Sequence, residues 1–275
     1  MSKADSSRGF WFLIATQFQG AFSDMTYKTV LSMVAVGIAA TQSDRSNYLS
    51  LIQIVFLVPF LLFSMIGGFL ADRFSKRTVT LGTKAWELGI MLLATLAAWA
   101  GSLNGGLVVL FLLSTQAALF GPTKYSILPE LLPSKRLSWG NGILEMTTFV
   151  SIILGTVAGC LLVESFRGRL YVSGLILAVL SVVGIGTSAA IGPLHSANPA
   201  ARLNWNLFGE VFHCVREARK DRPLWLAVIG SMYFWFLGLL LQTNILVYGS
   251  QVLHLGERDI SYLMAALALG IGLGS

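Results

Sequence analysis

The sequence predicts an all-α integral membrane protein, and three observations carry that prediction. Hydrophobic residues make up 55% of the 275-residue chain and charged residues only 12%, about half the charged share of a soluble domain. The mean hydropathy is +0.73, and the apolar residues form runs long enough to cross a bilayer as helices. The charges gather between these runs. Because the runs recur along the whole chain, a signal peptide followed by a soluble domain is excluded.

The apolar runs predict eight helices joined by connectors. Glycine, proline and charged residues bound the runs, and Pro59 is expected to kink the second helix. The predicted helices cover residues 9–38, 48–70, 79–100, 107–125, 137–163, 170–191, 223–248 and 260 onward. The last run is still apolar at Ser275 and is shorter than the ~20 residues of a full span. We therefore expect the chain to stop inside its eighth helix.

Residues 194–222 interrupt the apolar pattern and divide the chain into three parts. We expect an N-terminal six-helix bundle over residues 1–193, a cytoplasmic linker over 194–222, and the start of a second bundle over 223–275. Within the linker, apolar residues from Trp205 to Val215 fall largely on one helical face, and basic residues follow them. This pattern predicts an amphipathic helix at the membrane surface.

Lysine and arginine are distributed unevenly over the predicted connectors. Most lie in the N-terminal tail, after the second and fourth helices, and in the linker. The alternate connectors hold only Arg45, Arg167, Arg169 and Arg258. Cytoplasmic connectors carry the excess of Lys and Arg, so the N-terminus and the linker are predicted to be cytoplasmic. The formal net charge of +6 follows from this topology, and no nucleic-acid partner is expected.

The loop between the second and third predicted helices carries the most specific motif. It reads Gly67-Gly68-Phe69-Leu70-Ala71-Asp72-Arg73-Phe74-Ser75-Lys76-Arg77. This loop resembles the signature G-x-L-A-D-R-x-G-R-K/R of the major facilitator superfamily, with Ser75 where that family usually has glycine. The resemblance implies two six-helix halves, each built from inverted three-helix repeats. Here that means the N-terminal half plus helix seven and part of helix eight. It also implies a gating motif formed by Gly68, Asp72, Arg73, Lys76 and Arg77.

Ionisable residues inside predicted spans are costly and usually functional. Asp24 is predicted beyond the bilayer midplane, with Lys28 one turn further. Asp24 either faces a central cavity, where it meets a cation or a substrate ammonium, or forms an i,i+4 ion pair with Lys28. Lys84 and Glu87, three residues apart, are expected to form a structural pair near the cytoplasmic interface, where long side chains snorkel.

Glu145 has no cation three or four residues away in its own predicted helix. Its partner must therefore come from another helix, a wet cavity or the substrate. Lys124, near the cytoplasmic end of the fourth helix, is the natural candidate. The pair either locks two helices together or forms part of a cavity wall. In the same helix as Glu145, Gly155 and Gly159 are spaced for close packing against a neighbouring helix.

A narrower resemblance rests on three segments, Gly20-Ala21-Phe22-Ser23-Asp24, Phe120-Gly121-Pro122-Thr123-Lys124-Tyr125-Ser126-Ile127-Leu128-Pro129-Glu130-Leu131-Leu132, and Gly140-Asn141-Gly142-Ile143-Leu144-Glu145. They resemble the bacterial lysophospholipid transporter branch, including the transporter segment that is fused in some bacteria to an acyltransferase and an acyl-acyl carrier protein synthetase. The resemblance implies that Asp24, Lys124 and Glu145 line the substrate path, and we add the neighbouring Lys28. Met25 stands where that family often has asparagine, and the seventh helix offers Gln242 and Asn244 but no cation.

Together with these charged residues, the resemblance implies a transporter that moves lysophospholipid, such as lysophosphatidylethanolamine, from the outer to the inner leaflet of the bacterial inner membrane by alternating access. The carboxylates would receive the ammonium of the headgroup and Lys124 its phosphate. The expected partners are the lysophospholipid, the lipid bilayer and an acyltransferase domain further along the natural chain.

The sequence is also compatible with other functions. Within transporters, the alternative is a proton- or sodium-coupled carrier of a small polar solute, with Asp24 and Glu145 as coupling sites. A membrane-embedded acyltransferase would need a nucleophile or a His/Asp catalytic pair, and we expect none in this segment. A scaffold without transport activity is a third alternative. The histidines and cysteines show no metal-ligand spacing, so we expect no metal, no cofactor and no catalytic residue.

Overall fold

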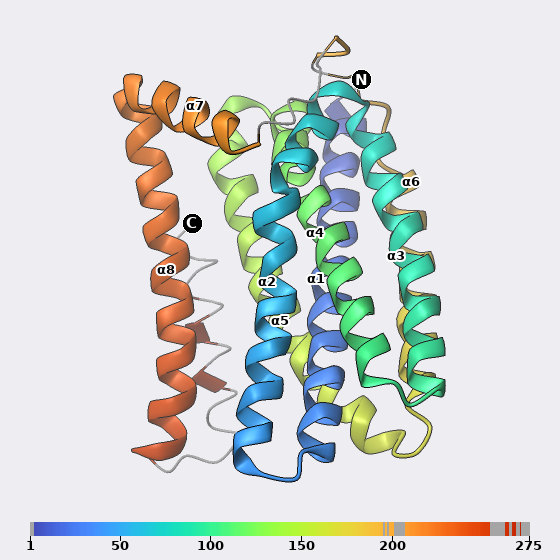
Figure 1. Cartoon of the computed structure of the whole chain (residues 1–275). Coiled ribbons are helices and arrows are strands. Elements are labelled where there is room, and N and C mark those ends of the chain that lie inside the picture. Colours follow the sequence, from blue (N-terminus) through green and yellow to red (C-terminus); the bar gives the residue numbers. More distant parts are fainter. Residues whose placement is uncertain are drawn as a thin grey trace. The chain divides into compact units, whose positions relative to one another are not determined.

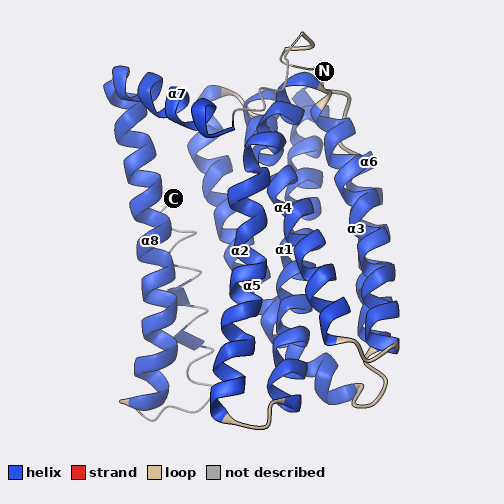
Figure 2. Ribbon diagram, in the orientation of Figure 1, coloured by secondary structure: helices blue, strands red, loops and turns tan. Residues whose placement is uncertain are grey.

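The computed structural model describes residues 3–194, 196, 198–200 and 207–253, together with 262–263, 266–267 and 270. Its elements are helices throughout the labelled part of the chain (Figures 1 and 2). The chain forms two compact units, Met1–Ala201 and Arg202–Gly274. The first contains α1 (Lys3–Ile38), α2 (Gln42–Arg73), α3 (Lys76–Trp99), α4 (Leu103–Leu131), the 3-10 turn η1 (Ser134–Arg136), α5 (Leu137–Ser165) and α6 (Tyr171–Ala189). The second contains α7 (Leu207–Lys220) and α8 (Arg222–Gln251).

Helix α1 is the central element of the first unit. It contacts α2, α4, α5 and α6, whereas α3 packs on α4 and α6. Five stretches within the described residues are long and apolar enough to cross a membrane: α2, α3, α4, α5 with the preceding turn, and α6. Helix α1 is long enough but carries more polar residues, such as Gln17, Gln19 and Ser23, all of which are buried. These polar side chains face neighbouring helices, as expected for polar groups at membrane depth.

The close approach of α5 to α1 depends on Gly155 and Gly159, as their spacing predicts. A methyl group added at Gly155 would lie 2.7 Å from the backbone oxygen of Phe22. One added at Gly159 would lie 2.7 Å from Cβ of Thr29 and 2.9 Å from the backbone oxygen of Thr26. Small residues that let two backbones approach are a common basis of helix association in membranes.

A closed polar network joins α1, α3 and α6 in the interior. Lys84 Nζ donates to Glu87 Oε2 at 2.6 Å and to Gln19 Oε1 at 2.9 Å. Gln19 Nε2 and Ser181 Oγ donate to Glu87 Oε1, at 2.8 and 3.1 Å. A methyl group at Gly20 would lie 2.6 Å from Lys84 Nζ, so this glycine leaves the space that the ammonium occupies.

The Lys84–Glu87 pair forms as predicted, but neither side chain extends to the surface of the bundle as snorkelling would require. Both side chains are 0% exposed, because the face of α3 that carries them packs against α1 and α6. The pair survives burial because each partner has further hydrogen bonds. A buried ion pair needs such bonds to repay the cost of desolvation.

The predicted helix ends differ from the structure mainly where proline and polar residues suggested connectors. Helix α4 continues past Tyr125 to Leu131, with Pro122 and Pro129 inside it. Ile127, Leu128 and Leu131 in this last part are almost fully buried in one hydrophobic cluster with residues of α1 and α5. Burial of these side chains compensates for backbone hydrogen bonds that proline cannot form. Helix α1 likewise begins inside the predicted polar tail, at Lys3.

Helix α7 is the first described element of the second unit, and it lies inside the predicted linker. Val211, Phe212 and Val215 of this helix are exposed, and its last turn contains Arg219 and Lys220. Asp221 caps α8 by accepting a hydrogen bond from the backbone of Leu224. The eighth predicted helix, from residue 260 onward, lies largely outside the described residues. The division of the chain at 193 and 223 stays a prediction.

We predict that Gly155→Ala destabilises the protein, because the added methyl group meets backbone atoms of α1 that cannot move independently. The expected loss is about 1–3 kcal/mol, measurable as a lower melting temperature of the purified protein in detergent. Gly186→Ala in α6 is the matched control, because a methyl group there has no atom within 4 Å. Since alanine favours helix more than glycine does, this control should melt at or above the wild-type temperature. Equal melting of the Gly155→Ala variant would contradict close packing.

We also predict that Lys84→Met costs about 3–5 kcal/mol, because it leaves the buried Glu87 carboxylate without a cation. Adding Glu87→Gln should recover most of this loss, because the neutral amide can still bond Gln19 and Ser181. Thermal denaturation of both variants in the same detergent tests the prediction. A single variant as stable as wild type, or a double variant no better than the single one, would show that the network is not what holds these three helices together.

Candidate functional site

Three predicted site residues from three helices come within electrostatic range of one another. Asp24 of α1, Lys124 of α4 and Glu145 of α5 are each half-buried. The charges of both carboxylates act on the Lys124 ammonium. Asp24 also lies within range of the Lys84–Glu87 pair. Residues separated by more than a hundred positions in the sequence thus share one region of the first unit, because α4 and α5 both pack on α1.

Glu145 has one satisfied and one unsatisfied carboxylate oxygen. Its Oε1 accepts a hydrogen bond of 2.7 Å from the Tyr125 hydroxyl, whereas its buried Oε2 has no hydrogen-bond partner. The direct pair with Lys124 that the sequence favoured is wrong: the ion pairs among the described residues do not include it. The Lys124 ammonium instead lies 5.0 Å from the centroid of the Tyr125 ring. Tyr125 therefore takes the place of lysine as the direct partner of the carboxylate.

Asp24 likewise keeps an oxygen without a partner. Its Oδ1 is buried and makes no hydrogen bond. The alternative in which Asp24 pairs with Lys28 is wrong for this structure, where the described ion pairs do not contain either residue. Lys28 lies over the ring of Phe56 in α2, 4.4 Å from its centroid. The structure therefore separates Lys28 from the carboxylate that its spacing suggested as a partner.

Unsatisfied buried oxygens are uncommon and need an explanation. Here two of them belong to carboxylates at predicted membrane depth, where an unpaired charge is especially costly. A cationic ligand would lower this cost, and Lys124, which lies within electrostatic range of both carboxylates, offers a donor for an anion. The arrangement suits a zwitterion that carries both signs of charge.

Sequence reasoning missed two residues of this region. Tyr125 donates a hydrogen bond to Glu145. The only feature of the sequence that pointed to Tyr125 was its position directly after Lys124 in the quoted segment. Thr123, on the other side of Lys124, is fully buried, and its Oγ1 has no hydrogen-bond partner. Neither residue could be placed without knowing which face of α4 meets α5.

The predicted gating motif ties α2 and α3 to other helices at one end of the bundle. Lys76 forms an ion pair with Glu130 in the last part of α4. Arg77 Nη2 donates to the backbone oxygen of Ala189, at the end of α6, at 2.7 Å. Arg73 lies 5.6 Å from the centroid of the Phe69 ring. The loop thus connects α2 and α3 to both α4 and α6.

Other parts of the motif have different surroundings from those expected. Gly68 has no atom within 4 Å of an added methyl group, whereas one at Gly67 would lie 2.8 Å from the backbone oxygen of Leu119. Gly67 is therefore the residue that permits the close approach of α2 to α4. Asp72 is exposed, and its backbone oxygen accepts a hydrogen bond from Asn198. Ser75, in the place of the usual glycine, donates to the backbone oxygen of Leu194 at 2.7 Å.

Metal and catalytic chemistry receive little support from the residues that the structure covers. Those residues contain no group of three or more His, Cys, Asp or Glu that could hold a metal ion. The sequence does contain one His/Asp pair with the spacing H-x-x-x-x-D, His254 and Asp259, so the expectation that no such pair occurs is wrong. The pair lies outside the described residues.

Comparison with known proteins identifies the family of the chain. The family model of the Major Facilitator Superfamily matches residues 13–275. The lysophospholipid transporter LplT of Cronobacter sakazakii is 27% identical over 277 residues, which cover 98% of this chain and 65% of that protein. The transporter of the same name from Citrobacter koseri is also 27% identical, with the same coverage. The chain thus spans about two thirds of the length of these curated relatives.

Solved structures show the same fold. A POT family transporter in complex with a thioalcohol conjugated peptide superposes with a TM-score of 0.58 at 19% identity, over 89% of this chain and 51% of that one. An auto-inhibited POT family peptide transporter gives 0.57 at 20% identity, over 97% and 52%. These identities support the fold alone. Together with the family match over nearly the whole chain, they confirm the predicted fold class: this chain belongs to the Major Facilitator Superfamily and is a multi-pass membrane protein.

Proposed function

We propose that the chain is the larger part of a transporter that moves lysophospholipid from the outer to the inner leaflet of the bacterial inner membrane by alternating access. The observation that carries the proposal is the shared region of Asp24, Lys124 and Glu145, where two carboxylate oxygens lack partners. The names of the relatives, lysophospholipid transporters, support the substrate class. They also favour a transporter over an enzyme in this segment.

The headgroup of lysophosphatidylethanolamine matches the charges of this region. Its ammonium would bind Asp24 and Glu145, and its phosphate would bind Lys124 through charge-assisted hydrogen bonds. Tyr125 would hold the Glu145 carboxylate in position. Lys28 stays in the proposed site, because a cation–π contact such as the one with Phe56 is worth only about 0.5–2 kcal/mol and can be exchanged for a phosphate. The acyl chain would stay against apolar helix surfaces during the movement.

The proposal includes an orientation and a gate. The excess of lysine and arginine on one side supports a cytoplasmic N-terminus. The Lys76–Glu130 pair and the Arg77 contact lie at that same end, so the motif would hold the cytoplasmic side closed in one state. Gly68, Asp72 and Arg73 would belong to this gate without touching substrate. An acyltransferase domain further along the natural chain is a proposed partner, because it would consume the delivered lysophospholipid.

We predict that Asp24→Asn and Glu145→Gln each lower transport more than tenfold in the natural protein. A charge-assisted hydrogen bond contributes about 1.5–3 kcal/mol, and 1.4 kcal/mol corresponds to a factor of ten. The measurement is the rate at which fluorescent lysophosphatidylethanolamine, added to vesicles, becomes protected from extraction by albumin. Glu217→Gln is the control, because this exposed carboxylate in α7 pairs only with Lys220 among the described residues.

Two outcomes would contradict this proposal in different ways. Wild-type transport by both variants would remove Asp24 and Glu145 from the site while leaving the substrate in place. No lysophospholipid movement by the wild-type protein, together with proton- or sodium-dependent uptake of a small polar solute, would favour the alternative carrier function instead.

We predict that Lys76→Gln slows transport several-fold and leaves lysophospholipid binding unchanged, because it weakens one end state of the gate and not the site. The charge-reversed pair Lys76→Glu/Glu130→Lys should restore most of the rate. Lys135→Gln is the matched control, since Lys135 is exposed at the same end of the bundle. Transport and equilibrium binding are measured on the same vesicle preparations. Failure of the reversed pair to improve on the single variant would show that the ion pair does not control the gate.

A further inference from the structure

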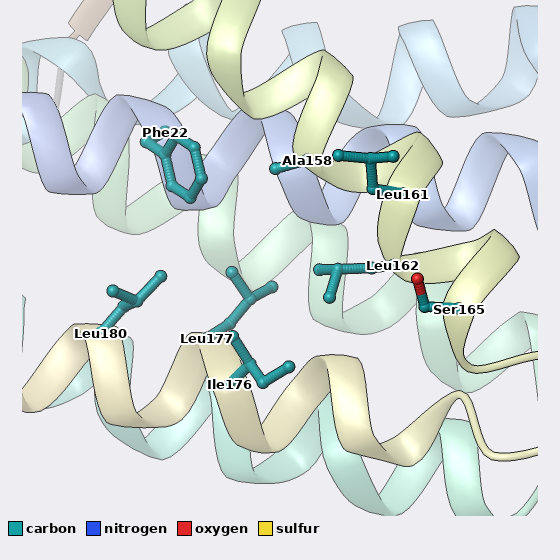
Figure 3. A pocket seen from close by; sticks show the side chains of 8 residues that line it. All are labelled: Phe22, Ala158, Leu161, Leu162, Ser165, Ile176, Leu177 and Leu180. Carbon is teal, nitrogen blue, oxygen red and sulfur yellow. The ribbon is translucent and has the colours of Figure 1, made fainter.

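An apolar groove lies between α5 and α6, with α1 as its floor. Both helices pack against α1, and Phe22 of α1 lies at the bottom of a cavity of about 250 Å³. Figure 3 shows Leu161 and Leu162 of α5 on one side and Ile176 and Leu180 of α6 on the other. Ser165, at one end of the row, brings a hydroxyl group to the lining.

The groove reaches from the core of the unit to its surface. Leu177 is 1% exposed, whereas Leu161 is 56% exposed. On the proposed topology this outer edge faces hydrocarbon, so an acyl chain can leave the bilayer and enter the groove without crossing water. The cavity is smaller than the ~300–1,000 Å³ of pockets for drug-sized ligands. It therefore suits one acyl chain better than two.

Two arginines follow Ser165, which lines one end of the groove. Arg167 and Arg169 belong to the short connector between α5 and α6, and Gly168 between them has a φ of +81° that lets the chain turn sharply. Both arginines are exposed, and the ion pairs among the described residues include neither. Planar guanidinium groups are well suited to bind phosphate.

These two arginines lie on the predicted outer side, whereas most lysines and arginines of the chain lie in the connectors of the other side. In Figure 1 the α5–α6 connector lies at the end of the first unit opposite the N-terminus, the same end as the α1–α2 connector. This is the proposed outer side, where the positive-inside rule disfavours lysine and arginine. Two arginines within three residues on this side are explained if they bind an anionic group at the surface of the outer leaflet.

We propose that this groove is the first binding site for lysophospholipid from the outer leaflet. The acyl chain lies between α5 and α6, and the phosphate lies at Arg167 and Arg169. This inference rests on the proposed function, whose direction of transport it explains. Phe22 is two residues from Asp24 on α1, roughly 3 Å along the helix axis. A lipid whose chain reaches Phe22 therefore extends to the depth of the charged site.

The experiment uses the natural protein in vesicles with lysophosphatidylethanolamine that carries a photoreactive diazirine in its acyl chain. Irradiation should label peptides of α5 and α6 that contain Leu161 and Ile176. Excess unlabelled lysophosphatidylethanolamine should abolish this labelling, and the same amount of diacyl phosphatidylethanolamine should not.

Two pairs of variants test the chain site and the phosphate site separately. Ala158→Phe, which fills the groove, should lower labelling at least fivefold. Val157→Phe is its control, because Val157 is exposed and does not line the groove. Arg167→Gln/Arg169→Gln should weaken binding about tenfold in a titration, whereas Arg45→Gln, in the α1–α2 region of the same proposed side, should not change it. Because these arginines are exposed in a connector, this variant should fold even if Ala158→Phe does not.

Three results would overturn the inference. Equal displacement by diacyl lipid would make the groove a site for ordinary bilayer lipid. Absence of lipid label from α5 and α6 in the wild-type protein would show that the groove does not bind an acyl chain. Unchanged labelling in both test variants would remove the named residues from the site. Any of these results together with normal transport leaves the proposed function intact. Specific labelling without any lysophospholipid movement would instead reject transport.

Discussion

The tight packing of α1 against its neighbours is the constraint on which the first unit depends. Glycines of α5 let the backbone of α1 approach so closely that an added methyl group would overlap it. This approach surrounds α1 with protein on several sides. Polar side chains on α1 therefore lie largely away from bulk water in this structure. Each must find a partner within the helix bundle or stay unpaired at a cost.

The polar residues around α1 form two groups, one whose side chains have hydrogen-bond partners within the bundle and one whose side chains keep atoms without partners. Toward α3 and α6, Gln19, Lys84 and Glu87 satisfy one another. Toward α4 and α5, Asp24 and Glu145 keep oxygens without partners. A complete network stabilises and fixes one arrangement, whereas the unpartnered oxygens of the incomplete one are the positions that the proposed ligand would bind. The difference in hydrogen bonding, more than the presence of charge, separates the structural group from the candidate site.

The same unit places different chemistry at its two ends and its middle. At the N-terminal end, the α2–α3 loop holds α4 and α6 through an ion pair and a backbone contact. At the opposite end, an apolar groove opens beside two arginines that the described ion pairs leave out. Asp24 and Glu145 lie on α1 and α5, which also line the groove, and Lys124 lies on α4. The proposed alternating access would use a fixed central site with separate contacts on either side.

The sequence by itself determined the fold class, the helical runs and the candidate residues Asp24, Lys124 and Glu145. Apolar runs and loop signatures are local, and a charge inside such a run is visible wherever it points. Only the tertiary structure decided which charges meet. Lys84 and Glu87 form a fully buried pair. Tyr125, and not Lys124, makes the hydrogen bond to Glu145. Lys28 lies over the ring of Phe56 instead of pairing with Asp24. Pairing of this kind depends on the rotation of each helix about its axis. That rotation is set by small residues and packing at contacts between helices distant in the sequence.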